Sequence, residues 1–207
     1  MNQELKQYVE TTIIPKYEMF DKAHNRTHVC TVIAESLILA KDYPLNTNMV
    51  YTIAAYHDLG LCKDRATHHL VSGEILENDK MLYRWFTEEE IRVMKEAVED
   101  HRASSDHEPR SIYGKIVADR IIDPEITLRR TVQYGLKQNP AENTEWHYNR
   151  FLNHLLNKYA EGGYLKLWFE HSKNGEKLRE LRSLINNREE LRNVFNKIFE
   201  EETNLQI

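Results

Sequence analysis

The chain has 207 residues, a length that accommodates one large domain or two small ones. Apolar residues make up 41% of it and charged residues 29%, which excludes a disordered, a collagen-like or a membrane-spanning chain. Seven glycines and five prolines are fewer than a β protein with many tight turns requires, so the composition predicts an all-α fold. A net charge of −5 disfavours a long nucleic acid as partner.

Cysteine usage and hydropathy indicate the compartment. Cys30 and Cys62 are too few for a disulfide framework and lack the spacing of a CxxC motif or a zinc finger, which fits a reducing environment. The first residues do not follow the basic, apolar and small pattern of an export signal, and the sequence has no run of 18 apolar residues. We therefore expect a cytoplasmic protein without a membrane partner.

The expected helices are amphipathic and are joined by short polar loops. The pattern predicts them over 26–42 and 46–60, from a capping box at Thr87, and from Ser111 to about residue 122. Gly60 is the expected left-handed stop of the second helix.

Helical periodicity continues from about residue 127 to the end. We expect a single domain over 1–207, with a core at about 20–125 and a helical extension at about 126–207 that packs with it. The stretch 139–144 is the best linker candidate.

Several polar residues fall on the apolar faces of these helices. Residues at i, i+3, i+4 and i+7 share a face, and His57, His101 and Asp119 each continue an apolar stripe, while His28 lies at the edge of one. Asp58 follows His57 directly. Because a carboxylate in a core must be paired, hydrogen-bonded or bound to a metal, these positions need an explanation.

A metal ion explains them as a set. One histidine on an apolar face is more often a satisfied core residue, and we interpret His154 in that way. Two imidazoles and two carboxylates on separate helices offset the charge of a divalent ion, and they supply the mixed nitrogen and oxygen ligands that suit Mn, Fe, Co, Ni or Zn.

The segment from Ala54 to Gly60, with His28 upstream and Asp119 downstream, resembles the HD superfamily of metal-dependent phosphohydrolases. The shared motif is a His, then a His-Asp pair, then an Asp, and it lies within about 20–125. The resemblance implies an HD-type helical bundle in which His28, His57, Asp58 and Asp119 bind one divalent metal, with Mg added to the ions above.

Two further histidines fit the resemblance. His69, before Ser72 and Gly73, and His101, at the end of a helix, correspond to residues that bind a second metal in dinuclear members and contact the substrate in mononuclear ones. We take the mononuclear interpretation first, with Asp58, His69 and His101 as catalytic residues. His68 is expected to point outward.

The implied activity is hydrolysis of a phosphate ester of a nucleotide or other small phosphorylated metabolite by a metal-activated water. Substrate phosphate needs positive donors, and four basic residues adjoin the motif residues in sequence. These candidate substrate-binding residues are Arg65, Arg102, Lys115 and Arg120.

Two other functions stay open. One is a dinuclear-iron oxygenase of the same superfamily, which requires His69 and His101 both to be ligands. The other is a non-catalytic nucleotide- or metal-binding module whose C-terminal helices contact a partner, and association of copies as a homo-oligomer is also left open. The apolar cluster from Tyr164 to Phe169 is interpreted as core, and it would be an association surface if exposed.

Overall fold

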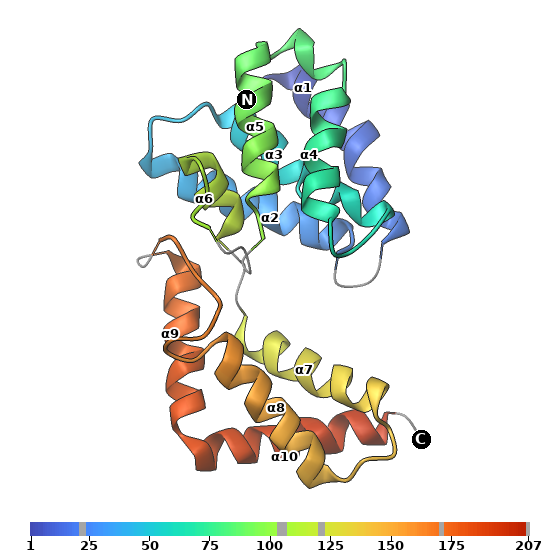
Figure 1. Cartoon of the computed structure of the whole chain (residues 1–207), viewed down its shortest axis with the longest axis vertical. Coiled ribbons are helices and arrows are strands. Elements are labelled where there is room, and N and C mark those ends of the chain that lie inside the picture. Colours follow the sequence, from blue (N-terminus) through green and yellow to red (C-terminus); the bar gives the residue numbers. More distant parts are fainter. Residues whose placement is uncertain (21–23, 103–106, 120–122, 170–171, 206–207) are drawn as a thin grey trace. The chain divides into compact units, whose positions relative to one another are not determined.

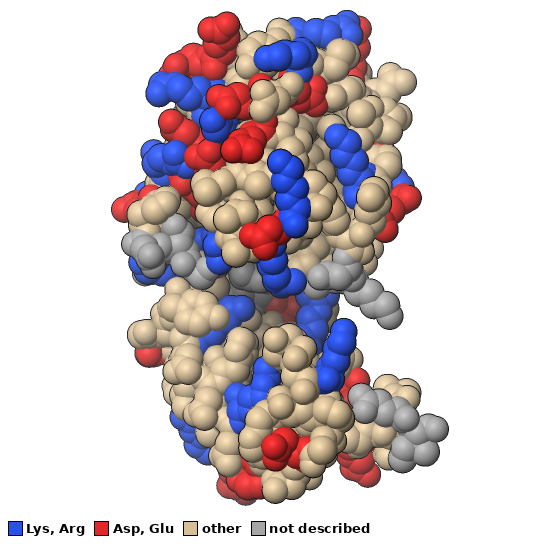
Figure 2. All heavy atoms as spheres, turned by 45° about the vertical axis from the view of Figure 1, so that its right-hand side comes forward, with Lys and Arg blue, Asp and Glu red and all other residues tan. Residues whose placement is uncertain are grey.

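The computed structural model describes residues 1–20, 24–102, 107–119, 123–169 and 172–205. Every regular element within these ranges is helical, so the predicted all-α fold is confirmed. The chain divides into two compact units, Met1–Ile121 and Ile122–Ile207 (Figure 1). No helix of the described residues combines the length and apolarity that crossing a membrane requires. Acidic and basic side chains are interspersed over the face drawn in Figure 2.

The first unit is built around α3 (Thr47–Tyr56), in which every residue from Met49 to Tyr56 is buried. A helix that is apolar on all sides needs neighbours on all sides. The helices that pack against α3 are α2 (Arg26–Leu39), α4 (His68–Asn78), α5 (Glu88–Glu99) and α6 (Ile112–Ala118) (Figure 1). Short 3-10 turns lie between these helices at η3 (Ala40–Asp42), η4 (Leu59–Cys62) and η5 (Leu82–Arg84).

The N-terminal residues belong to the same core. They form α1 (Gln3–Tyr8), a π-helical turn η1 (Val9–Ile13) and a 3-10 turn η2 (Ile14–Met19). The side chains of Leu5, Val9, Ile13 and Tyr17 are fully buried. The core of this unit therefore begins well before residue 20, where the sequence pattern had placed its start.

Local caps explain the helix starts that the sequence predicted. The Thr87 hydroxyl accepts from the Glu90 N–H at 3.2 Å, and the Glu90 carboxylate accepts from the Thr87 N–H at 2.9 Å, so the predicted capping box is present. The Ser111 hydroxyl caps α6 by accepting from the Gly114 N–H. These hydrogen bonds join residues that are close in sequence, so both helix starts could be predicted from the sequence alone.

The second unit consists of α7 (Pro124–Gln138), α8 (Thr144–Lys158), α9 (Lys173–Asn186) and α10 (Arg188–Asn204). Its core includes the rings of Phe151 and Phe195, with centroids 5.1 Å apart. The stretch 139–144, expected as a linker, joins α7 to α8 within this unit. The expected helix through Tyr164–Phe169 is wrong, because the described residues between α8 and α9 form an irregular connection in which Leu165 is buried and Tyr164 is exposed.

Candidate metal centre

The centre lies where α3 ends, at the pair His57-Asp58. Both side chains are buried, with residue exposures of 4% and 5%. The helix stops at Tyr56, so it ends before Gly60, and Gly60 does not have the expected left-handed conformation, because Gly162 has the one positive φ in the described chain. Asp58 is thus held in the interior at a helix terminus.

Four imidazoles surround the Asp58 carboxylate. Its Oδ2 atom lies 3.0 Å from His57 Nε2 and 3.3 Å from His28 Nε2. Its Oδ1 atom lies 3.3 Å from His101 Nε2 and 3.4 Å from His68 Nε2. Each carboxylate oxygen therefore faces one pair of histidines, and each pair comes from two different helical segments.

Three of these imidazoles are fixed in the tautomer that a metal ligand requires. The Nδ1 atoms of His57, His68 and His101 lie 2.8, 2.8 and 2.6 Å from the backbone carbonyl three residues earlier. A carbonyl can only accept, so Nδ1 carries the proton and Nε2 presents a lone pair toward Asp58. Metal-binding histidines commonly have this hydrogen bond, which also fixes the orientation of the ring.

The resulting set of atoms fits a cation. His68 Nε2 and His101 Nε2 are 3.1 Å apart, and both lie within 3.4 Å of Asp58 Oδ1. With neutral imidazoles all three atoms are acceptors, so they repel one another unless a positive charge lies among them. Two groups of this kind, His28-His57-Asp58 and Asp58-His68-His101, have the arrangement of metal ligands and share Asp58. These candidate ligand atoms of the described residues could therefore hold one metal ion or two.

The charge states agree with this interpretation. Burial would raise the pKa of Asp58, but interactions with the neighbouring imidazoles of His57, His101 and His28 outweigh it and hold the pKa well below its ordinary value. Burial and then repulsion from His101 lower the pKa of His68 to about 4. Burial also lowers the pKa of His28. At neutral pH the carboxylate of Asp58 is therefore ionised, and the imidazoles of His28 and His68 are unprotonated.

Gly60 determines how closely α4 approaches Asp58. A Cβ atom at position 60 would lie 2.0 Å from the carbonyl oxygen of His68 and 2.8 Å from the Ser72 nitrogen, far inside contact distance. The Gly60 N–H also donates to the Ser72 hydroxyl at 2.8 Å. The first turn of α4 therefore lies directly on the chain that follows Asp58, and this brings His68 to the carboxylate.

The structure places His68, and not His69, next to Asp58. His68, expected to point outward, contacts both Asp58 and His101. His69 is in neither group of candidate ligands, so the expectation that it joins His101 at a second metal is not met by the geometry. His68 precedes the buried Ser72 by four residues and His69 precedes it by three, so helical spacing alone was consistent with either.

Asp119 is buried, with an exposure of 5%, and it follows α6 directly. That helix packs against α2 and α3, which carry His28 and His57. Asp119 does not complete either group of three, although the resemblance implied it as the fourth ligand. Its role as a ligand stays a prediction.

The four basic candidates have different surroundings. Arg102 follows His101 and donates to the Ala66 carbonyl at 2.8 Å, close to His68 in sequence. Arg65 is exposed, and its carbonyl is the acceptor for His68 Nδ1. Lys115 pairs with Glu108 at 2.5 Å. Arg120 lies outside the described residues.

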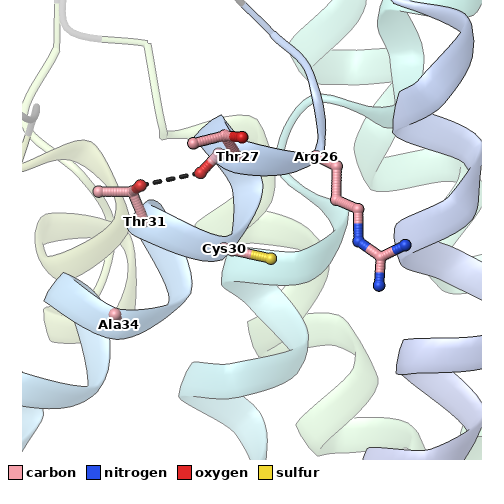
Figure 3. Close-up of a pocket in the computed structure, with 5 residues that line it drawn as sticks. All are labelled: Arg26, Thr27, Cys30, Thr31 and Ala34. Atoms are coloured by element: carbon pink, nitrogen blue, oxygen red, sulfur yellow. Dashed lines mark hydrogen bonds between the residues drawn. The ribbon is translucent and has the colours of Figure 1, made fainter.

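A shallow pocket of about 470 Å³ on the outer face of α2 is a separate feature (Figure 3). Its lining contains no imidazole, and its single charged residue, Arg26, pairs with Glu18 at 3.4 Å. The Thr31 hydroxyl in the pocket donates to the Thr27 carbonyl of the same helix, as Figure 3 shows. The candidate metal ligands therefore lie at Asp58 and not in this pocket.

Comparison with known proteins does not identify a family for the chain. The chain matches no model of a protein family, no curated protein and no solved structure.

Proposed function

We propose that this chain is a metal-dependent phosphohydrolase similar to the HD superfamily, with Asp58 at the centre of its metal site. The observation that supports the proposal is the set of acceptor atoms around Asp58, in which imidazole Nε2 atoms and a carboxylate oxygen lie 3.1 to 3.4 Å apart. Such a set is unfavourable without a cation and favourable with one. The proposed substrate is a phosphate ester of a nucleotide or other small phosphorylated metabolite.

The two groups that share Asp58 support the following choice of ligands. His28, His57 and Asp58 would hold one ion, with Asp119 as a further ligand, and Asp58, His68 and His101 would hold a second. A divalent ion there supplies a Lewis acid that activates water and polarises a phosphoryl oxygen.

The side chains of the chain have three tasks in this proposal. Asp58 stays ionised and lies between the two pairs of imidazoles. The backbone carbonyls that accept from Nδ1 keep the rings of His57, His68 and His101 in place before any ion binds. Arg102 and Arg65, which adjoin His101 and His68, supply positive charge for the phosphate of the substrate.

The test compares wild type with Asp58→Asn, which keeps the shape of the side chain and removes its charge. Both proteins are reconstituted with Mn²⁺, Co²⁺, Zn²⁺ or Fe²⁺, their metal content is measured by elemental mass spectrometry, and hydrolysis of nucleotides and p-nitrophenyl phosphate esters is followed. Wild type should hold metal and hydrolyse part of the panel, whereas Asp58→Asn should lose both. Asp79→Asn is the control, because Asp79 is a carboxylate of the same unit that accepts from Tyr8 and Tyr56 instead of facing imidazoles.

Two results would contradict the proposal. One is wild-type protein that binds no metal after reconstitution, and the other is Asp58→Asn protein that keeps its full metal content and activity. Metal binding without hydrolysis of any ester in the panel would point to the non-catalytic module instead.

The sharing of Asp58 by two groups also favours a second candidate, the dinuclear-iron oxygenase. That activity requires two irons per chain and consumption of O₂. Anaerobic reconstitution with Fe²⁺, followed by exposure to O₂ in the presence of candidate substrates, separates the two activities, because a hydrolase uses water alone.

A further inference from the structure

The end of α3 leaves backbone groups that need partners from elsewhere. The helix stops at Tyr56, and Asp58 has φ −110° and ψ 5°, in the region between helical and extended backbone. The last carbonyls of a helix have no partner within it, and such groups are costly when they are buried. The ring of His57 binds one of them, the carbonyl of Ala54.

The hydroxyl of Tyr17 binds two more groups at this break. It donates to the carbonyl of Ala55 at 2.9 Å and accepts from the N–H of Asp58 at 3.3 Å. Tyr17 is fully buried on η2, and its ring lies 6.3 Å from the ring of His57 at an interplanar angle of 29°. One side chain from the N-terminal segment therefore contacts the backbone on both sides of His57 and also faces its ring.

These two bonds constrain the direction of the Asp58 side chain. A hydroxyl has one proton to donate and lone pairs that accept, so the Tyr17 oxygen satisfies the Ala55 carbonyl and the Asp58 N–H at the same time. The two bonds tie the backbone at Ala55 and at Asp58 to one buried oxygen. The carboxylate must then reach both pairs of imidazoles at once, and sites of this kind tolerate displacements of only about 0.5 Å.

We propose that Tyr17 is a positioning residue of the metal centre, whose hydroxyl sets the break after α3 so that each oxygen of Asp58 faces one pair of histidines. The inference rests on the proposed metal binding and adds a residue that does not itself touch an ion.

The test uses Tyr17→Phe, which keeps the ring and its contact with His57 and removes only the hydroxyl. The probe is Co²⁺, whose binding is measured by titration and whose visible spectrum reports the geometry of its ligands. Residues that orient metal ligands typically change affinity by about 10- to 100-fold, so we expect Co²⁺ to bind Tyr17→Phe at least about 10-fold more weakly, with altered band positions or intensities.

Tyr56→Phe is the matched control. Tyr56 is also fully buried and lies on α3, but its hydroxyl donates to Asp79 Oδ2 at 2.6 Å. It should lose thermal stability as Tyr17→Phe does and keep the wild-type Co²⁺ affinity and spectrum. A role of Tyr17 in stability alone would leave the two variants alike in Co²⁺ binding.

If Tyr17→Phe does not fold, the second variant is Tyr17→4-aminophenylalanine. Its amino group still donates a hydrogen bond to the Ala55 carbonyl. Its Co²⁺ affinity should lie below that of wild type, since the acceptor for the Asp58 N–H is weakened. Wild-type affinity and spectrum in whichever of the two variants folds would overturn the inference, as would equal weakening in Tyr56→Phe. Wild-type protein that binds no Co²⁺ would overturn the proposed function together with it.

Discussion

Both units bury histidines, but the charged groups nearest to those histidines differ. In the first unit His57, His68 and His101 face the carboxylate of Asp58. In the second unit His147 is 3% exposed, lies 5.1 Å from the ring of Trp146 and 5.3 Å from that of Phe199, and has its pKa lowered by burial and then by the charge of Arg150.

The half-buried His154 repeats the pattern of the second unit. Burial and then the charges of Lys158 and Arg150 lower its pKa. Cationic neighbours repel a metal ion as they repel a proton, whereas a shared carboxylate attracts both. Burial alone therefore does not identify a histidine as a candidate metal ligand. The distinguishing feature is an anion that faces Nε2.

The largest expected effect comes from replacing two adjacent histidines, His68 and His69, one at a time. His68→Gln should lose the ion held with His101, and protein reconstituted with Mn²⁺ or Co²⁺ should fall from two ions per chain to one. His69→Gln should keep both ions, because His69 is in neither group. Elemental analysis of the two variants is the measurement, and equal metal content in both would remove His68 from the site.

A substitution that strongly destabilises the second unit should leave the candidate metal centre intact. Phe195 is fully buried between Phe151 and Tyr148, so Phe195→Ala should cost about 3–5 kcal/mol through lost contacts and a cavity. The cost would be measured by chemical denaturation and the metal content on the folded protein. Loss of metal from the folded variant would show that the centre depends on the second unit.

An ion-pair comparison should give a smaller effect. Arg129 on α7 donates to Glu202 at 2.8 Å and to Glu201 at 2.7 Å on α10, and Glu202 is 8% exposed. Arg129→Ala leaves that buried carboxylate with less compensation and should lower the free energy of unfolding. The exposed pair of Arg92 and Glu89 is the control, and Arg92→Ala should lower it less. Equal losses of unfolding free energy would mean that burial of Glu202 adds nothing.

The smallest expected effect is the pH dependence due to His147. Its pKa in the folded chain lies below the ordinary value of 6.5, so the unfolded chain binds more protons as the pH falls through that value. The free energy of unfolding should therefore decrease on acidification below about pH 6.5, by at most about 1.4 kcal/mol per pH unit from this group. Thermal unfolding of metal-free His147→Gln should show a flatter pH profile than wild type, and identical profiles would contradict the assignment.

Sequence alone predicts those features that depend on neighbours along the chain. The cap at Thr87, the buried stripe of α5 and the inward position of His57 and His101 all follow from spacing within one helix. Tyr17 could not be found in this way, because its bonds to Ala55 and Asp58 join segments about 40 residues apart.

The expected outward position of His68 is wrong for a related reason. His68 is the first residue of α4, and its ring is held by the carbonyl of Arg65, which precedes the helix and lies outside its periodicity. The run from Tyr164 to Phe169 is dense in apolar residues, which resembles helical periodicity, but it follows Gly162 and Gly163 and forms an irregular connection.

Gly60 gives a criterion that can be read from sequence alone in any relative of this chain. Since even a methyl group at this position would collide with the backbone of α4, a chain with another residue there must hold that helix further from its aspartate. Such a chain could keep the first pair of histidines and would lose the second. If the proposed metal binding holds, the residue two places after the His-Asp pair should therefore separate relatives that bind one ion from those that bind two, before any of them is purified.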